Sequence, residues 1–360
     1  MSRRSRLLLL CLLAAGCSPY KPFDSAAYVR QKGALAGVAV PFEINDEVRA
    51  AYDESARRVS GQRKKVAQVV DFIFDRLDLT YSLAPTHDAI GTFRERRGNC
   101  LSFVNLFVGL AREQGLAPFY VEVTDYQTWN QREGMVVSQG HIVAGMYLEG
   151  ELATYDFLPY RPKAYKDFKP IDDLTATAHY YNNLAAEALM DGDLAAAGRN
   201  VQIATTVAPG FVKAINNLGV YQARSGHPEQ ALATYQRGLA LEPDNPTLLT
   251  NLSRVYQRLG RDQEAADLFA RLESTQNTNP FFFVYQGEMA LSHGDTAKAL
   301  EYMARALRQD TELPEIHLGL VKVYLAMGDL ERARHHLERA LKLDATNTEA
   351  LRYARLLAAQ

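Results

Sequence analysis

The sequence is poor in cysteine and tryptophan and has no excess of positive charge. Its 360 residues include 3 cysteines and 1 tryptophan, and 40 lysines and arginines stand against 42 aspartates and glutamates. Nothing in this balance predicts binding to nucleic acid, for which a basic patch would be expected. No calcium loop of the EF-hand type is present, and no motif predicts another metal or a cofactor. With 47% hydrophobic residues, the chain is long enough for two hydrophobic cores.

The N-terminus has the layout of an export signal. Three arginines precede the apolar run Leu7–Ala15, which is too short to span a bilayer as a mature helix. The run ends in LAAGC, and this motif resembles the lipobox of bacterial lipoproteins. The resemblance implies a signal peptide of residues 1–16, lipidation of Cys17 and a membrane anchor in the cell envelope. Ser18 favours the outer membrane, facing the periplasm. The alternative is an ordinary signal peptide with a cysteine near its cleavage site.

Cys100 would then be the only free thiol of the exported protein. Cys11 lies in the signal peptide, and lipidation uses Cys17. An unpaired thiol in an oxidising compartment is either buried and inert or has a use. Cys100 is therefore interpreted either as a reactive nucleophile or as a buried, inert side chain.

The N-terminal half mixes helical and strand-like segments. Residues 17–59 are expected to form a tether with one short strand, GVAVPFEI, and a short helix, Asp46–Arg58. Apolar spacing predicts two further helices, Arg63–Leu77 and the more buried Leu101–Gln114. Three segments rich in β-branched and aromatic residues then predict strands: PFYVEVTDY, GHIVAGMYLEGE and LATYDFLPY.

Cys100 is placed to react because it lies at the expected start of a helix. Unpaired N–H groups and a partial positive charge at a helix N-terminus favour the thiolate, which is the nucleophilic form. The backbone N–H of Cys100 could also donate to an oxyanion, and Asn99 is a further candidate donor.

A thiolate nucleophile needs an acid–base partner, usually a histidine oriented by a third group. His141 begins one predicted strand, and Asp156 lies in the next, across a turn at Glu149–Gly150. Opposing residues in an antiparallel hairpin have a nearly constant sum of residue numbers. His141 and Asp156 are therefore predicted to be cross-strand neighbours.

Cysteine in GNC at a helix start, followed by these two residues on adjacent strands, resembles the transglutaminase-like superfamily. The resemblance covers roughly residues 60–165 and implies a papain-like α+β fold. It implies Cys100 as the nucleophile, His141 as general base and then acid, and Asp156 as the orienting carboxylate. Unlike the animal enzymes, the sequence has no aromatic residue directly after the cysteine and no tryptophan two places after the histidine. Hydrolysis of an amide is therefore favoured over amine crosslinking. A buried, inert Cys100 is the alternative.

The C-terminal half is repetitive. Glycines recur every 34 residues, and an alanine follows each of them five positions later. The glycines are Gly192, Gly226, Gly260, Gly294 and Gly328. Small residues at a fixed period are typical of stacked helix pairs, and GHPEQALATYQRGLALEPDNP closely resembles the tetratricopeptide consensus. Residues 178–347 are predicted to form five repeats, and residues 348–360 a capping helix.

Tetratricopeptide stacks bind peptides along the concave face made by the first helix of each pair. Polar residues predicted on that face are Asn182, Lys213, Asn216, Arg224, Arg254, Gln257 and Arg258. They suit a partner that presents carboxylates or peptide backbone. The alternative is that they form ordinary solvated helix faces.

The sequence therefore predicts a papain-like, transglutaminase-like α+β domain of residues 60–170, followed by an all-α tetratricopeptide solenoid. The predicted protein is a lipid-anchored cysteine peptidase or amidase that acts on a protein or peptide substrate. The repeats would hold a protein partner. The competing hypothesis is a non-catalytic scaffold lipoprotein that assembles an envelope complex.

Overall fold

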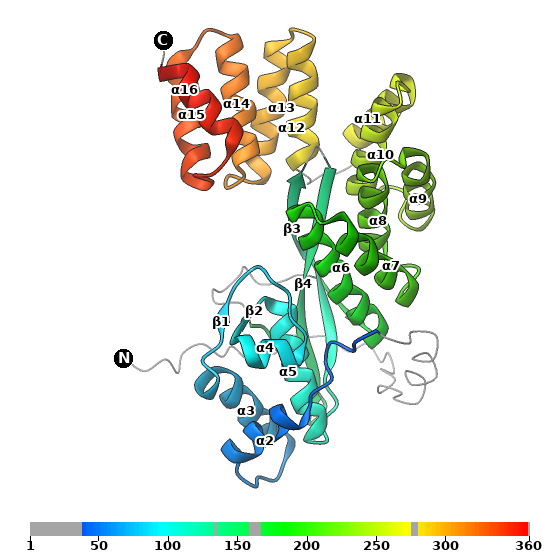
Figure 1. The fold of residues 1–360 in the computed structure, drawn as a ribbon, viewed down its shortest axis with the longest axis vertical. Coiled ribbons are helices and arrows are strands. Elements are labelled where there is room, and N and C mark those ends of the chain that lie inside the picture. The colour runs from blue at the N-terminus through cyan, green and yellow to red at the C-terminus, as the bar shows by residue number, and fades with distance from the viewer. Residues whose placement is uncertain (1–37, 133–134, 158–166, 275–279, 359–360) are drawn as a thin grey trace. The chain divides into compact units, whose positions relative to one another are not determined.

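The computed structural model describes residues 38–132, 135–157, 167–274 and 280–358 (Figure 1). The chain divides into two compact units. The first runs to Leu241, apart from the tip of one hairpin, and the second begins at Glu242. The predicted signal peptide and Cys17 lie outside the described residues. In the part of the chain that is described, no helix combines the length and apolar character that crossing a membrane requires.

The N-terminal part of the first unit contains several short helices, some with polar side-chain caps. In chain order they are α2 (Asp46–Ser55), α3 (Gln62–Asp71), the π-helical turn η2 (Phe72–Arg76), α4 (Ala89–Glu95) and α5 (Cys100–Glu113). Asn45, Asp88 and Asn99 each accept a hydrogen bond from the N–H group three residues later, which fixes the starts of α2, α4 and α5. The helix predicted at Arg63–Leu77 is thus an α-helix with a π-helical end.

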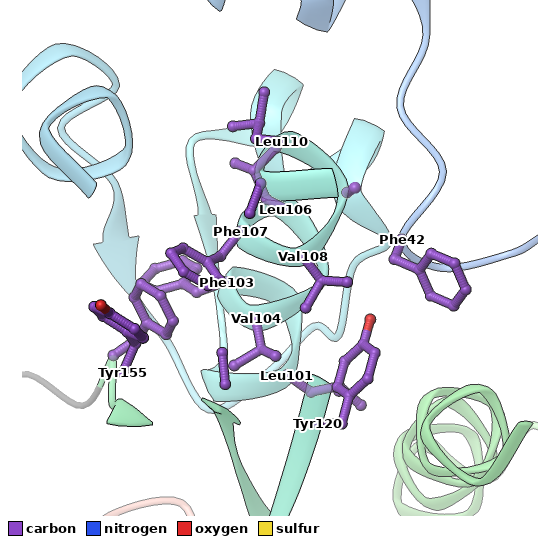
Figure 2. Packing of buried hydrophobic residues seen from close by; sticks show 14 of the residues in the cluster. Phe42, Leu101, Phe103, Val104, Leu106, Phe107, Val108, Leu110, Tyr120 and Tyr155 are labelled. Atoms are coloured by element: carbon purple, nitrogen blue, oxygen red, sulfur yellow. The ribbon is translucent and has the colours of Figure 1, made fainter. Parts of the chain in front are cut away.

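Helix α5 lies at the centre of the hydrophobic core. Every side chain from Cys100 to Ala111 is buried, so the helix is covered on all sides. Figure 2 shows its aromatic side chains directed toward Tyr155 of the sheet, and the ring centroids of Phe107 and Tyr155 are 5.0 Å apart. Inside this core, the Tyr120 hydroxyl donates a hydrogen bond to Asn105 Oδ1 at 2.9 Å. The start of α5 is therefore set by a closely packed scaffold.

An antiparallel sheet of four strands packs against these helices in the order β5-β4-β3-β6. The strands are β3 (Phe119–Arg132), β4 (Met135–Leu148), β5 (Glu151–Tyr155) and β6 (Phe168–Ile171). The hairpin predicted at Glu149–Gly150 is present, with Leu148 opposite Glu151. Strand β6 was not predicted, because its sequence FKPI contains a proline and has little β character.

Residues 38–44, the described part of the predicted strand GVAVPFEI, do not form a strand, and that prediction is wrong. The N–H of Glu43 donates to Val40 O, which closes a turn, and Phe42 is buried against the core. A Cβ atom on Gly109 would lie 2.5 Å from Phe42 O, so glycine allows this segment to cross α5 closely. The apolar residues of this segment pack against α5 and do not pair with a strand.

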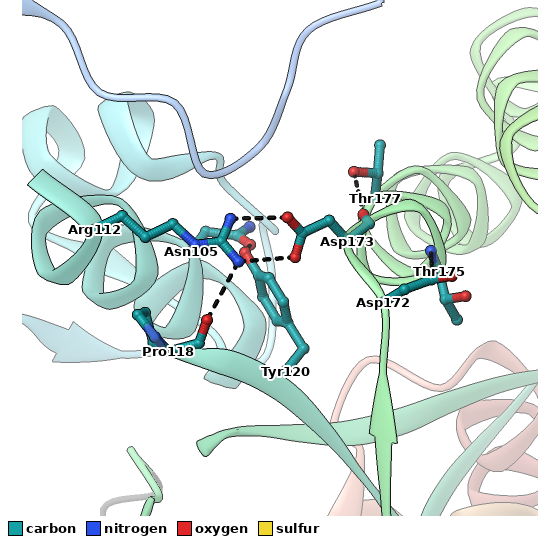
Figure 3. Close-up of polar contacts among 8 residues, drawn as sticks. All are labelled: Asn105, Arg112, Pro118, Tyr120, Asp172, Asp173, Thr175 and Thr177. Atoms are coloured by element: carbon teal, nitrogen blue, oxygen red, sulfur yellow. Dashed lines mark hydrogen bonds and ion pairs between the residues drawn. The ribbon is translucent and has the colours of Figure 1, made fainter. Parts of the chain in front are cut away.

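Two helix pairs complete the first unit. They are α6 (Asp173–Asp191) with α7 (Leu194–Val207), and α8 (Val212–Arg224) with α9 (Pro228–Leu241). Tyr180 and Tyr181 of α6 belong to the same buried cluster as the side chains of α5. Arg112 of α5 also forms a two-pronged ion pair with Asp173 of α6, with both N–O distances 2.9 Å (Figure 3). The first helix pair therefore shares a core with the α+β domain.

From Glu242 onward, the described residues of the second unit form helices and their connections. The helices are α10 (Pro246–Arg258), α11 (Asp262–Ser274), α12 (Pro280–Ser292), α13 (Thr296–Gln309), α14 (Pro314–Ala326), α15 (Leu330–Leu343) and α16 (Thr348–Ala358). A Cβ atom on Gly287 or on Gly319 would lie 2.7 or 2.4 Å from the side chain of Met303, so α12 and α14 approach α13 closely at these points. The fold class predicted from the sequence, an α+β domain followed by paired helices, is confirmed.

Candidate active site

Cys100 is the first residue of α5, and Asn99 fixes the start of that helix. Asn99 Oδ1 accepts hydrogen bonds from the N–H and the Oγ of Ser102, both at 3.0 Å. The N–H of Cys100 belongs to the first turn, where backbone donors have no partner within the helix, and it donates to no acceptor in the described part of the chain. Cys100 is 8% exposed.

His141 and Asp156 come together across the β4–β5 hairpin. Ala144 of β4 pairs with Tyr155 of β5, so Asp156, the next residue, lies diagonally across from His141. His141 Nε2 is 3.1 Å from Asp156 Oδ1. The His141 side chain is 1% exposed, whereas that of Asp156 is 26% exposed. Because Nε2 faces the carboxylate, Nδ1 is the ring nitrogen that remains for the sulfur.

The sulfur and the imidazole shift each other's proton affinity in opposite directions. Burial alone would raise the pKa of Cys100, but the charge of His141, its hydrogen bond and the N–H of Ile142 together lower this pKa below the value of an ordinary thiol. Burial would likewise lower the pKa of His141, but the Cys100 sulfur and the Asp156 carboxylate raise this pKa to about 10. Each group thus favours the charged form of the other, as in a thiolate–imidazolium pair.

This arrangement is compatible with acyl transfer, because the His141 imidazole interacts with both the Cys100 thiol and the Asp156 carboxylate. Among the described residues, no three histidine, cysteine, aspartate or glutamate side chains gather in a way that could hold a metal ion.

Asn99 does not act as the oxyanion donor that the sequence suggested. Its Nδ2 donates to Thr86 Oγ1 at 2.6 Å and to Leu83 O at 3.4 Å. Both N–H bonds of the amide are therefore used. Thr86 also donates to Glu187, and no motif in the sequence indicated either of these residues. Their positions lie 101 residues apart, so no local pattern connects them.

The polar repeat residues of the first unit bind within that unit. Asn182 Oδ1 accepts from Asn217 Nδ2 at 2.8 Å, and Asn216 Nδ2 donates to Asn217 Oδ1 at 3.1 Å. Lys213 Nζ is 2.5 Å from Glu122 Oε1 of strand β3. Arg224 donates to Leu189 O. Asn182, Lys213 and Arg224 thus link α8 to α6 or β3, and a role for any of the four residues in binding a peptide stays a prediction.

In the second unit, the three predicted binding residues lie on α10. The guanidinium of Arg254 lies over the ring of Tyr285, 5.0 Å from its centroid, and Arg254 is 6% exposed. Gln257 accepts a hydrogen bond from the Tyr285 hydroxyl. Arg258 is exposed. Of the three, Arg258 is the residue most open to a partner.

Two family models match separate parts of the chain. Residues 49–160 match the transglutaminase-like superfamily. Residues 222–280 and 290–359 match the tetratricopeptide repeat. No curated protein matches this chain.

Several solved structures resemble the repeats. A thermophilic TPR protein of Thermus thermophilus is 22% identical, with 50% of this chain and 99% of that chain covered and a TM-score of 0.45. A structure from the functional characterisation of Pseudomonas aeruginosa pilF is 22% identical, with coverages of 51% and 83% and a TM-score of 0.42. The APC/C hetero-tetramer Cut9–Hcn1 is 17% identical, with coverages of 50% and 36% and a TM-score of 0.44. The family models carry the assignment: the protein has a transglutaminase-like core domain followed by tetratricopeptide repeats.

Proposed function

We propose that the protein is a cysteine hydrolase that cleaves an amide bond in a protein or peptide. Cys100 is the nucleophile, His141 the general acid and base, and Asp156 the residue that orients His141. The observation that carries this proposal is the 3.1 Å contact between His141 Nε2 and Asp156 Oδ1, beside a cysteine whose pKa is lowered. The match to the transglutaminase-like superfamily over residues 49–160 supports it.

The reaction starts from the thiolate and the imidazolium. The sulfur attacks the carbonyl carbon of the amide, and the N–H of Cys100 stabilises the oxyanion that forms. His141 gives its proton to the leaving nitrogen, the C–N bond breaks, and an acyl thioester remains on Cys100. Neutral His141 then takes a proton from water, and the hydroxide attacks the thioester. The carboxylic acid leaves, and the thiolate–imidazolium pair is restored.

A trapped acyl thioester tests the proposal. The intact protein is incubated with a cell lysate and quenched in acid, and the peptide that contains Cys100 is analysed by mass spectrometry. We expect an added acyl group on Cys100 that is absent from His141→Gln, which lacks the acid, and from Cys100→Ala. The thiol should also react with iodoacetamide well below pH 8. An unmodified Cys100 that alkylates like a free thiol would favour the scaffold hypothesis.

A labelled primary amine distinguishes hydrolysis from crosslinking. If water resolves the thioester, as we propose, the label is not incorporated into glutamine-bearing proteins. Incorporation that depends on Cys100 would instead identify an amine-dependent crosslinker.

We also propose that the protein is anchored in the cell envelope by lipid on Cys17. The support is the sequence LAAGC at the end of a short apolar run behind three arginines. Several acyl chains would hold the protein firmly, since each buried CH₂ contributes about 0.8 kcal/mol. Cys17→Ser should abolish incorporation of labelled palmitate and move the protein from the membrane fraction to the soluble fraction. Labelling that persists in this variant would overturn the anchor.

The repeats are proposed to bind a protein partner. The support is the tetratricopeptide match and the exposed Arg258 on α10. Arg258→Glu should weaken co-purification of that partner without changing the alkylation of Cys100. An unchanged set of co-purified proteins would remove Arg258 from the binding surface.

A further inference from the structure

Helix α6, the first helix of the repeats, reaches the loop before α4 through Glu187. Glu187 Oε1 accepts from the N–H of Thr86 at 2.9 Å and from Thr86 Oγ1 at 2.6 Å. The other carboxylate oxygen is 3.2 Å from the same N–H. Thr86 is 3% exposed, so these bonds form away from water, where they are strong and directional.

The hydroxyl of Thr86 in turn sets the orientation of Asn99. Because its hydrogen is directed to Glu187, Thr86 Oγ1 can only accept from Asn99, and Asn99 Nδ2 lies 2.6 Å away. The amide oxygen of Asn99 must then face α5, where it accepts from Ser102. If the Asn99 amide were turned the other way, its Nδ2–H group would face the N–H donor of Ser102, and no hydrogen bond could form there. The direction of the Asn99 cap therefore follows from an acceptor on α6.

A second contact holds the same turn of α5. Ser102 Oγ accepts from the N–H of His87 at 2.8 Å, in the same loop as Thr86. A Cβ atom on Gly98 would lie 2.5 Å from Ser102 Cβ, so the chain passes closely over this turn. Cys100 belongs to the turn that these contacts fix. The partial positive charge of that turn is what a helix N-terminus offers to a thiolate.

We propose that Glu187 is a positioning residue for Cys100: through Thr86 and Asn99 it holds the first turn of α5, so that a residue of the first tetratricopeptide repeat sets the reactivity of the thiol. The inference rests on the proposed function for its consequence in catalysis. We call these three residues the Glu187–Thr86–Asn99 network.

The test measures the rate of Cys100 alkylation by iodoacetamide against pH in the full chain, which needs no substrate. Thr86→Val removes the hydroxyl at nearly constant shape, and Glu187→Ala removes its acceptor. We expect both to raise the midpoint of the alkylation profile by about 0.5 to 1 pH unit, because the capped turn loosens beside the sulfur. Thr86→Ser keeps the hydroxyl and should keep the midpoint of the unchanged protein.

Tyr181→Phe is the matched control. It also removes one hydroxyl that links α6 to the preceding domain, since Tyr181 Oη donates to Ala39 O at 2.9 Å. It should lower the melting temperature without moving the midpoint, because this bond does not reach Asn99. A midpoint that moves as far in Tyr181→Phe as in Thr86→Val would show a general loss of packing and overturn the proposal.

The outcomes separate this inference from the proposed function. A midpoint of about 8.5 in the unchanged protein, as in a free thiol, would contradict the activation of Cys100 itself. A lowered midpoint that Thr86→Val and Glu187→Ala leave in place would overturn the Glu187–Thr86–Asn99 network alone. Circular dichroism identifies any variant that has lost its fold. If Thr86→Val is unfolded, the alkylation profile of Glu187→Ala alone tests the network.

Discussion

At the scale of single residues, the protonation of His141 depends on the sulfur beside it. The Cys100 sulfur is the largest influence that raises the pKa of His141 to about 10, and Asp156 adds to it against the effect of burial. The imidazole should therefore stay protonated through neutral pH, up to about pH 10. Between the lowered pKa of Cys100 and that limit, the thiolate–imidazolium pair is the stable form.

Cys100→Ala should lower the pKa of His141 by several units, because only burial and Asp156 then act on the imidazole ring. The measurement is a ¹⁵N NMR titration of the imidazole nitrogens, with His141→Gln used to assign the signal. A His141 that titrates near pH 6.5 in the unchanged protein would contradict the ion pair.

Asn99 shows what sequence reasoning can reach at this scale and what it cannot. The position of Cys100 at a helix start, and the approach of His141 to Asp156, follow from local patterns and a turn at known residues. The use of Asn99 as a cap whose amide is fixed by Thr86 does not. Its orientation depends on Glu187, 101 residues after Thr86, and no spacing within the chain encodes that contact.

At the scale of elements, the repeats and the β4–β5 hairpin could be predicted because their signals are local. The first helix of each pair ends at a glycine with positive φ, for example 82° at Gly192 after α6, and glycine adopts this conformation readily. Strand β6 carries no such signal, because its FKPI sequence becomes a strand only by pairing with β3. Its place in the sheet is decided by the tertiary fold.

Helices α14 and α15 are joined by a pair of histidines that acid should separate. His317 Nδ1 is 3.0 Å from His336 Nδ1, and the ring of His336 stacks on Tyr324 with centroids 5.6 Å apart. Burial, with a smaller effect of the neighbouring His317 and His335, lowers the pKa of His336 from 6.5 to about 4. The unfolded chain therefore binds more protons between these values. The stability of the helix pair should fall as the pH falls from about 6.5 to about 4.

His336→Phe keeps a ring on Tyr324 and removes the titrating group. The drop in melting temperature between pH 7 and pH 4.5 should shrink by about 3 °C or more in this variant. Differential scanning calorimetry at the two pH values measures it. His293→Phe, at an exposed position of the same unit, should leave the drop unchanged. Equal drops in the unchanged protein and in His336→Phe would exclude this histidine as a source of acid sensitivity.

At the scale of the whole molecule, the boundary between the two compact units falls after α9, inside the repeats. Tyr180 and Tyr181 of α6 are buried in the cluster that contains α5. Burying a large apolar side chain contributes about 1.5–3 kcal/mol, and a domain is stable by only about 5–15 kcal/mol. Removal of α6 should therefore unfold the first unit.

Two truncations test this boundary. A fragment of residues 38–241 should unfold in one cooperative transition and keep the alkylation profile of Cys100. A fragment of residues 38–171, which lacks α6, should be unfolded or bind a dye for exposed apolar surface. Circular dichroism and alkylation with pH distinguish the two fragments. A well-folded fragment 38–171 with an unchanged profile would show that the α+β domain stands without the repeats.

The core that the first helix pair shares with the α+β domain also limits where recombination can exchange the repeats to change the bound partner. Exchange of a whole repeat array at the end of the α+β domain would replace α6 and, with it, the acceptor that orients the Asn99 cap. A recombination joint after Leu241 leaves those contacts untouched, so binding specificity can change there while the reactive cysteine keeps its surroundings. Recombination is therefore better tolerated after Leu241 than between residues 160 and 222, where the matches to the two families separate.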